Sequence, residues 1–221
     1  MQPSERAREA LRRLLNHYER QRRSGSNDPF RALVRTILSQ NTGYKNVAMA
    51  YDRLEEEIGV TPEALAGAPV ERIAEAIRPA GMYNLRSATL KRVAEAVLER
   101  FGGDLSAVLD GPYLEAREAL MGLPGVGAKT ADVVLMFEAG KEIVPVDRHI
   151  FRIARRLRFV PERASYDEVR LALEAAAPPG RHEDVHVLLI RFGREICGAR
   201  RPRCPECFLN DLCPFGPDHG G

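Results

Sequence analysis

The sequence predicts an all-α fold, and three observations lead to that prediction. Apolar residues recur at the three- and four-residue spacing of amphipathic helices through most of the 221-residue chain. Glycine pairs, prolines and short polar residues stand where these apolar stripes begin and end. Strand-like alternation is rare, and the segment 143–146, which looks extended, contains a proline that makes it a poor strand. We therefore expect helices joined by short turns.

Five helices are expected in the first half of the chain. Asn27 or Asp28 can cap the first of them, and Pro29 suits its first turn. Thr61 opens a short third helix in the same way, and a glycine pair at 102–103 ends the fifth. The apolar stripes are Phe30, Leu33, Val34, Ile37 and Leu38 in the first helix, Val47, Tyr51, Leu54 and Ile58 in the second, Ile73 and Ile77 in the fourth, and Leu90, Val93, Ala94, Val97, Leu98 and Phe101 in the fifth.

Four more helices are expected in the second half. A buried helix covers 130–137, and a basic helix covers 148–157. Ser165 and Glu168 have the spacing of a capping box before the next helix. The last helix runs directly into Cys197 and carries Val185, Leu188, Leu189, Phe192 and Ile196.

Composition and charge exclude several classes of protein. A hydrophobic content of 44% with 29% charged residues is typical of a soluble globular protein. No run approaches the ~18 apolar residues of a membrane span, and the amino terminus lacks an apolar signal core. With a net charge of only +2, affinity for nucleic acid must come from local patches. We expect a soluble cytoplasmic protein with no membrane association, and the best linker candidate is 22–27.

All four cysteines of the chain lie within 17 residues near its carboxyl end. Cys197, Cys204, Cys207 and Cys213 are separated by six, two and five residues. Four thiolates at such spacings suit one metal site, and both zinc and iron–sulfur clusters accept them. Disulfides are the alternative, although thiols of a cytosolic protein stay reduced. The ligand set alone leaves the metal open.

A glycine hairpin, Leu123-Pro-Gly-Val-Gly-Ala-Lys-Thr130, lies between two expected helices. Gly125 and Gly127, on either side of Val126, let the backbone turn tightly and approach another surface. Backbone N–H groups of the hairpin and of the following helix would suit a phosphate, aided by the helix dipole. The alternative is an ordinary helix–helix turn, because Gly-x-Gly alone is a weak signal.

Lys129 and Asp147 are the candidate catalytic residues. Lys129 starts a helix whose next residues are apolar, and such surroundings would disfavour the charged amine and make it a nucleophile. Asp147 stands just before the basic helix, where it could move protons or stabilise developing positive charge. Its alternative role is to cap that helix.

Three motifs in this order closely resemble the endonuclease III family of helix-hairpin-helix DNA repair glycosylases. They are the hairpin 123–131, the segment 146–150 and the four cysteines; weaker matches occur at 37–42 and 81–84. The resemblance covers about residues 28–215 and implies two helical domains with a DNA-binding cleft between them. One would span 28–137, and the other would combine 1–27 with 138–221. It also implies that the cysteines hold a [4Fe–4S] cluster in a carboxyl-terminal loop.

By this resemblance Lys129 matches the nucleophile of the family and Asp147 its essential carboxylate. The implied enzyme is a DNA N-glycosylase and abasic-site lyase. It would remove oxidised pyrimidines from double-stranded DNA through a Schiff base on the lysine and cut the abasic strand by β-elimination. Its partner would be DNA that contains damaged bases or abasic sites, and we expect a monomer in a bacterial cytoplasm, associated with the nucleoid.

Several expected DNA contacts and pocket residues also follow from the resemblance. The wedge that fills the space of an extruded base corresponds to Asn41, with Gln40 beside it, and to Met82, where glutamine and leucine are more usual. Tyr44 stands where an aspartate is common, and with Ser39 it is expected at the substrate pocket. Ordinary packing is the alternative for Tyr44. The loop between the first two cysteines is expected to contact phosphates through Arg200, Arg201 and Arg203.

Other functions fit parts of the same pattern. A paralogue that binds lesions with weak catalysis would explain the altered wedge and pocket positions. A relative specialised for mismatched thymine or uracil would share all three motifs. A regulatory zinc tetrathiolate module would explain the cysteines but not the lysine and aspartate. A bifunctional glycosylase explains all of these features together.

Overall fold

The structure, a computed structural model, describes residues 1–20 and 28–216, and these residues form helices and no strand. The all-α prediction is therefore confirmed for this part of the chain. The expected linker at 22–27 and the alternative cap Asn27 lie outside the described residues. The chain divides into two compact units, Ser24–Lys141 and Met1–Arg23 with Glu142–Gly221. The domain limits expected from the sequence, 28 and 137, lie a few residues inside these bounds.

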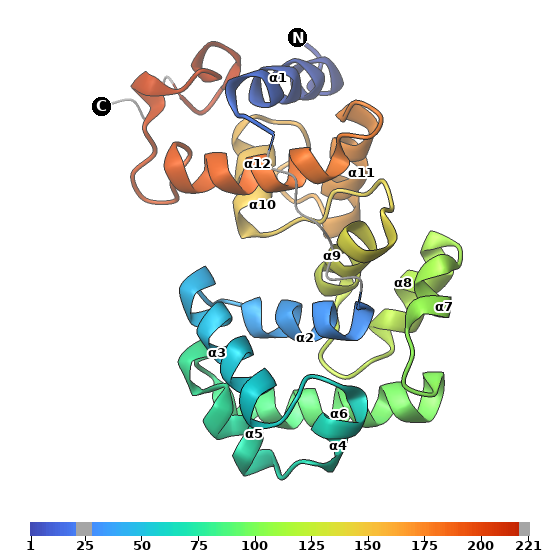
Figure 1. The fold of residues 1–221 in the computed structure, drawn as a ribbon. Coiled ribbons are helices and arrows are strands. Elements are labelled where there is room, and N and C mark those ends of the chain that lie inside the picture. The colour runs from blue at the N-terminus through green and yellow to red at the C-terminus, as the bar shows by residue number, and fades with distance from the viewer. Residues whose placement is uncertain (21–27, 217–221) are drawn as a thin grey trace. The chain divides into compact units, whose positions relative to one another are not determined.

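The unit Ser24–Lys141 contains eight α-helices and one 3-10 turn among its described residues, labelled in Figure 1. Their bounds are α2 Pro29–Ser39, α3 Tyr44–Glu57, α4 Pro62–Gly67, α5 Val70–Ala76, η1 Arg78–Ala80, α6 Tyr83–Phe101, α7 Ser106–Asp110, α8 Tyr113–Met121 and α9 Ala128–Ala139. The long helix α6 packs against α4, α5 and α2, while α9 packs between α2 and α8. This arrangement places the turn that joins α8 to α9 beside α6.

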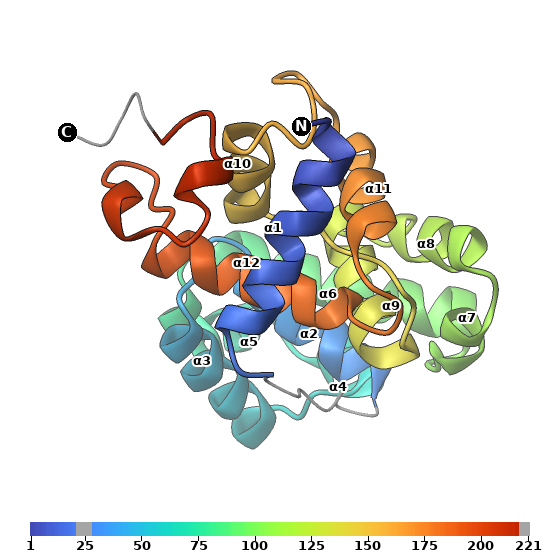
Figure 2. The same cartoon turned by 90° about the horizontal axis from the view of Figure 1, so that it is seen from above.

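The unit formed by Met1–Arg23 and Glu142–Gly221 contains four α-helices and two 3-10 turns among its described residues. They are α1 Pro3–His17, α10 Arg148–Arg156, α11 Tyr166–Ala176, α12 His182–Glu195, η2 Cys204–Glu206 and η3 Asn210–Leu212. α12 contacts both α1 and α10, and Figure 2 shows α1 running across it. Gly193 makes the crossing with α10 close, because a Cβ there would lie 2.9 Å from the Cβ of His149.

The caps follow the expected chemistry. Asp28 caps α2 by accepting a hydrogen bond from the N–H of Arg31 at 3.0 Å. Thr61 caps α4 in the same way, and Ser165 with Glu168 forms the predicted capping box of α11. These three helices therefore begin where local sequence signals predict them.

Three helices are not predicted individually by the apolar pattern. α1 buries two alanines and two leucines, so its apolar stripe is weak. α7 has only five residues, and α8 buries only Ala116 and Leu120. Such elements are stabilised mainly by their tertiary contacts, which no local pattern reveals. Among the described residues, no helix is long and apolar enough to cross a membrane.

Candidate functional site

The two glycines of the hairpin between α8 and α9 have different roles: one allows its tight turn, and the other leaves its backbone accessible. Gly125 has φ +72°, and a Cβ there would lie 2.7 Å from Cγ2 of Thr89 on α6. A side chain at Gly127 would meet no atom within 4 Å, so another molecule can approach the backbone there. Val126, between them, is buried. The first turn of α9 follows directly, and the N–H groups of Thr130 and Ala131 donate to the carbonyl of Gly127.

A buried ion pair holds α8 against α9. The carboxylate of Asp132 on α9 is fully buried and accepts from Arg117 Nε at 3.0 Å and from the Tyr113 hydroxyl at 2.9 Å. Both partners belong to α8. Breaking such a pair is costly because it leaves a charge buried alone. The sequence does contain a signal, since Asp132 interrupts an otherwise apolar run, but its partners cannot be read from it.

Lys129 is the second residue of α9 and is half-buried. The residues that follow, from Ala131 to Met136, are all buried, so the backbone of Lys129 belongs to a helix fixed in the core. The adjacent Thr130 is buried, and its hydroxyl accepts from Gln40 Nε2 at 3.3 Å. The end of α2 is thereby joined to the first turn of α9. A nucleophile carried on such a rigid element is held in a defined position.

Asp147 is the N-cap of α10, as one of its two expected roles requires. Its Oδ1 accepts from the N–H groups of His149 and Ile150 at 2.8 and 2.9 Å. Within residues 1–20 and 28–216, Oδ2 makes no hydrogen bond to the protein. Capping therefore fixes the carboxylate and leaves one oxygen for another partner. Lys129 and Asp147 belong to different units.

The imidazole beside Asp147 is packed in the protein. His149 is half-buried, and its Nδ1 lies 3.1 Å from Nη2 of Arg152. Burial lowers the pKa of His149, and nearby arginines act in the same direction against the attraction of Asp147. A neutral ring at physiological pH follows from that shift.

The two loops expected to form the wedge share an unusual backbone. Asn41 and Met82 have φ +55° and +50°, the left-handed region that residues other than glycine rarely adopt. Asn41 is exposed, and the Met82 side chain is 57% exposed. Both residues are therefore presented to solvent on tightly turned segments.

Tyr44 and Ser39 occupy different environments. Tyr44 begins α3 and is 68% exposed, so its side chain is not packed in the core. Ser39 ends α2, is half-buried, and donates to the carbonyl of Thr36 at 2.7 Å. Of these two expected pocket residues, Tyr44 is the one whose side chain is available to a ligand.

The loop between the first two cysteines presents two arginines to solvent. Arg200 and Arg201 are exposed and have no side-chain hydrogen bond or ion pair within the described residues. Arg203 differs, because it forms an ion pair with Glu206. A Cβ at Gly198 would lie 2.9 Å from the carbonyl oxygen of Arg201, so the loop requires glycine at that position. The structure thus offers two available guanidinium groups here and a third that is engaged.

Two arginines of the basic helix α10 hold this loop. Arg156 donates to the carbonyl of Gly198 at 2.7 Å and approaches the sulfur of Cys197 at 3.4 Å. Arg152 donates to the carbonyls of Cys197 and Gly193 at 2.9 and 2.7 Å. The sequence predicts a basic helix here but no role for its arginines, because a run of arginines usually marks a solvated face. Arg148, Arg155 and Arg158 are exposed.

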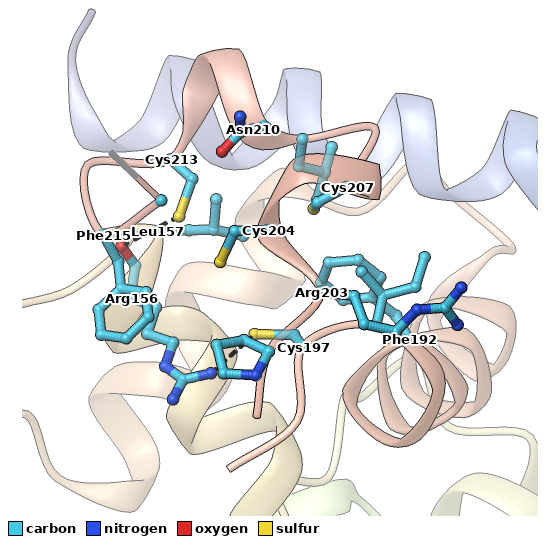
Figure 3. A pocket seen from close by; sticks show the side chains of 14 residues that line it. Arg156, Leu157, Phe192, Cys197, Arg203, Cys204, Cys207, Asn210, Cys213 and Phe215 are labelled. Atoms are coloured by element: carbon cyan, nitrogen blue, oxygen red, sulfur yellow. Dashed lines mark hydrogen bonds between the residues drawn. The ribbon is translucent and has the colours of Figure 1, made fainter. Parts of the chain in front are cut away.

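The four cysteines line one cavity, shown in Figure 3. All four thiols are free, and apolar side chains that include Leu157, Phe192, Ile196 and Leu209 complete the wall. Disulfides, the alternative drawn from the sequence, are absent among the described residues. No group of three or more histidine, cysteine, aspartate or glutamate side chains in this part of the chain is arranged to hold a single metal ion.

The chemistry of this cavity fits a bound inorganic group. Burial raises the pKa of Cys207 to about 11 and also raises that of Cys213. A buried thiolate therefore needs a positive partner, and a bound metal centre would displace the thiol protons. Arg156 and Arg203 both line the cavity, and the guanidinium of Arg156 lies 3.4 Å from the sulfur of Cys197 and 4.2 Å from the ring centre of Phe215.

Comparisons with known proteins agree with this geometry. The family model of the HhH-GPD superfamily of base excision DNA repair proteins matches residues 34–179. Endonuclease III of Thermotoga maritima is 35% identical over 210 residues, which are 95% of this chain and 91% of that protein. A solved trapped endonuclease III–DNA covalent intermediate, an estranged-adenine complex, has a TM-score of 0.86 at 29% identity over 99% of both chains. A thermostable thymine-DNA glycosylase has a TM-score of 0.82 at 26% identity, covering 98% of this chain and 100% of that one.

The helical fold with its glycine hairpin and the matched residues define the class of protein. This chain belongs to the HhH-GPD superfamily of base excision DNA repair proteins. Within that superfamily it is an endonuclease III-like enzyme of the DNA N-glycosylase and abasic-site lyase class.

Proposed function

We propose that this enzyme removes oxidised pyrimidines from double-stranded DNA and cuts the resulting abasic strand by β-elimination. The observation that carries the proposal is the position of Lys129, in the first turn of α9 directly after the open backbone of Gly127. The positive end of the helix dipole at such a helix start favours an anionic phosphate. The amine would then lie close to the sugar of the nucleotide whose phosphate is bound there.

The proposed reaction follows from the chemistry of an amine. Nζ of Lys129 attacks C1′ as the bond from C1′ to the base breaks, and the base leaves with the bonding electrons and takes up a proton. Ring opening gives a Schiff base between Nζ and C1′. Loss of a proton from C2′ then breaks the bond from C3′ to its phosphate, and water releases the lysine. Oδ2 of Asp147 is our candidate for the proton transfers, since Oδ1 is held by the cap.

Extrusion of the damaged base is assigned to the two exposed turns. Unstacking a base costs a few kcal/mol and requires that something fill the space left behind. Met82 and Asn41 are exposed on tight turns and would enter that space. Tyr44, exposed at the start of α3, would stack on or border the extruded base.

We also propose that Cys197, Cys204, Cys207 and Cys213 hold a [4Fe–4S] cluster. The four thiols line one cavity, as the ligands of a single inorganic group would. Zinc accepts the same four thiolates, and similarity to endonuclease III is what favours the cluster. When bound, the cluster would fix the loop that carries Arg200 and Arg201. Iron and sulfide in equal amounts in the purified protein would support it, whereas zinc without sulfide would overturn it.

Strand incision on defined duplexes tests the proposed substrate and reaction. A duplex with one thymine glycol should be cut and leave a 3′ unsaturated aldehyde, the product of β-elimination. Asp147→Asn should reduce incision about 100-fold or more, the usual scale for a proton-transfer residue. Strands that stay intact until they are treated with alkali would indicate glycosylase activity without lyase activity. Tight binding with no base release would indicate a lesion-binding protein instead.

A second candidate substrate is mismatched thymine or uracil. The similarity to a thymine-DNA glycosylase favours it, as does the exposed Tyr44 where the family commonly has an aspartate. Incision of a duplex with one T·G mismatch, compared with thymine glycol at equal enzyme concentration, separates the two. Faster cutting at the mismatch would favour this second substrate.

A further inference from the structure

A buried arginine lies under both exposed turns. Arg86, in the first turn of α6, is only 5% exposed. Its guanidinium donates to three backbone carbonyls, those of Gln40, Ala80 and Gly81, the last at 2.7 Å. The first carbonyl precedes Asn41 and the last precedes Met82. One side chain therefore joins two loops that are some forty residues apart in the sequence.

A threonine hydroxyl strengthens the same junction. Thr42 Oγ1 lies 2.8 Å from the carbonyl oxygen of Ala80, to which it donates. The two loops, 40–42 and 80–82, are thus held together by side chains that bond to main-chain oxygens on both sides. Of the two left-handed residues, Asn41 is the middle residue of loop 40–42 and Met82 is the last residue of loop 80–82. A residue other than glycine keeps a left-handed backbone conformation only when the surrounding contacts stabilise it.

Packing alone does not explain an arginine at this position. Among residues 1–20 and 28–216, no carboxylate forms an ion pair with Arg86. Burial lowers its pKa, which reflects the cost of placing the charge away from water. An apolar side chain of similar length would fill the space without that cost. The guanidinium offers what an apolar chain lacks, five N–H donors in a rigid plane that can reach several carbonyls.

We propose that Arg86 is a positioning residue that joins loops 40–42 and 80–82 into one rigid wedge, so that Asn41 and Met82 enter the DNA duplex together. The inference rests on the proposed function, because it concerns how the two loops enter the duplex when the damaged base is extruded. Without the guanidinium each loop would still bear its exposed residue, but only the Thr42 hydroxyl would join the two loops. The entropic cost of ordering both loops would then oppose their insertion into the duplex at every binding event.

Fluorescence of 2-aminopurine placed opposite a tetrahydrofuran abasic analogue tests the inference, because it rises when that base loses its stacking. Arg86→Met should still bind an undamaged duplex within about twofold of wild type, since the hairpin and the exposed arginines are unchanged. Its affinity for the abasic duplex should fall about tenfold, the scale of one lost charge-assisted hydrogen bond. The fluorescence gain at saturation should fall as well.

Three further variants make the test decisive. Arg92→Met removes an exposed arginine from the same helix and should behave as wild type, which controls for the lost charge. Arg86→Lys should recover only part of the signal, because its three donors share one nitrogen. Thr42→Val removes the second cross-loop bond and should reduce the fluorescence gain in a protein that keeps Arg86.

The outcomes separate this inference from the proposed function. A wild-type protein that shows no preference for the abasic duplex would overturn both. A wild type with that preference, and folded Arg86→Met and Thr42→Val variants that retain it together with the full fluorescence gain, would overturn the inference alone. An equal loss of affinity for damaged and undamaged duplexes would also overturn it, because it would assign Arg86 to folding only.

Discussion

The hairpin between α8 and α9 and the cysteine loop from Cys197 to Gly216 are built in opposite ways. The hairpin is short, lies between two helices and is anchored by the buried pair Asp132–Arg117. The cysteine loop contains only two 3-10 turns, and four thiols face the cavity at its centre. The chain's own side chains hold the first, whereas the second is the region proposed to be held by a bound cluster. On that proposal, the region of the chemistry does not depend on the cluster, and the role of the cluster is structural.

Removing a cysteine should give the largest effect, and it should destabilise the cysteine loop without destabilising the hairpin. Cys204→Ala takes away a buried ligand of the proposed cluster, and the binding free energy of a structural metal site, which is folding free energy, is on the order of 10 kcal/mol. Hydrogen exchange followed by mass spectrometry should show faster exchange in the cysteine loop and α12. Peptides from α8 and α9 should change far less. Equal acceleration in both regions would contradict a separate origin of their stability.

Removing the buried carboxylate tests the hairpin in the same way. Asp132→Ala removes the buried carboxylate that accepts from both Arg117 and Tyr113, so we expect a loss of about 3 to 5 kcal/mol in urea unfolding. Asp110→Ala, at an exposed position in α7, is the matched control and should stay within about 0.5 kcal/mol of wild type. If the two variants unfolded alike, Asp132 would not hold α8 to α9. The iron content should remain unchanged in both.

Substitutions at the two glycines of the hairpin should separate an effect on stability from an effect on DNA binding. Gly125→Ala places a Cβ at φ +72° and against Thr89, so we expect about 2 kcal/mol of destabilisation. Gly127→Ala meets open space at an ordinary φ and should change stability by less than about 0.5 kcal/mol. It should nevertheless weaken binding to duplex DNA, because the methyl group keeps the phosphate from the backbone. Thermal unfolding and fluorescence anisotropy on both variants measure the two effects.

The smallest expected effect concerns how α1 is fastened to the cysteine loop. Arg13 donates to Asp211 at 2.7 Å and to Glu9 at 2.8 Å. Hydrogen bonds from Arg12 and then Arg13 lower the pKa of Glu9 to about 2, and Arg13 lowers the pKa of Asp211. Folded pKa values below the usual ones mean that this stabilisation is present above about pH 4.5 and is lost as the pH falls towards 2.

Arg13→Gln should therefore lower the melting temperature slightly at pH 7 and hardly at all near pH 2. Because the carboxylate of Glu9 is exposed to solvent and screened, the difference at pH 7 should be small. Melting curves of wild type and variant between pH 2 and 7 provide the measurement. A difference that stays constant over this range would rule out the ion pairs as its source.

Features set by local chemistry could be predicted from the sequence. The caps of α2, α4 and α11, the cysteine spacing and the hairpin depend on residues close together in the chain. The pairing of Asp132 with Arg117 and of Arg86 with Gln40 depends on tertiary contacts between residues 15 and 46 positions apart. The left-handed conformation of Met82 could not be predicted from the sequence either, because methionine has no preference for it. The roles of Lys129 and Asp147 remain predictions.

Borohydride trapping tests the central claim most directly. Wild-type protein mixed with an abasic duplex and sodium borohydride should form a stable covalent adduct, because the reductant converts a Schiff base to an amine. Peptide mapping by mass spectrometry should place the modification on Lys129, and Lys129→Ala should abolish it while Lys45→Ala retains it. An adduct at another amine, or none at all despite tight binding, would contradict the assignment of Lys129 as the nucleophile.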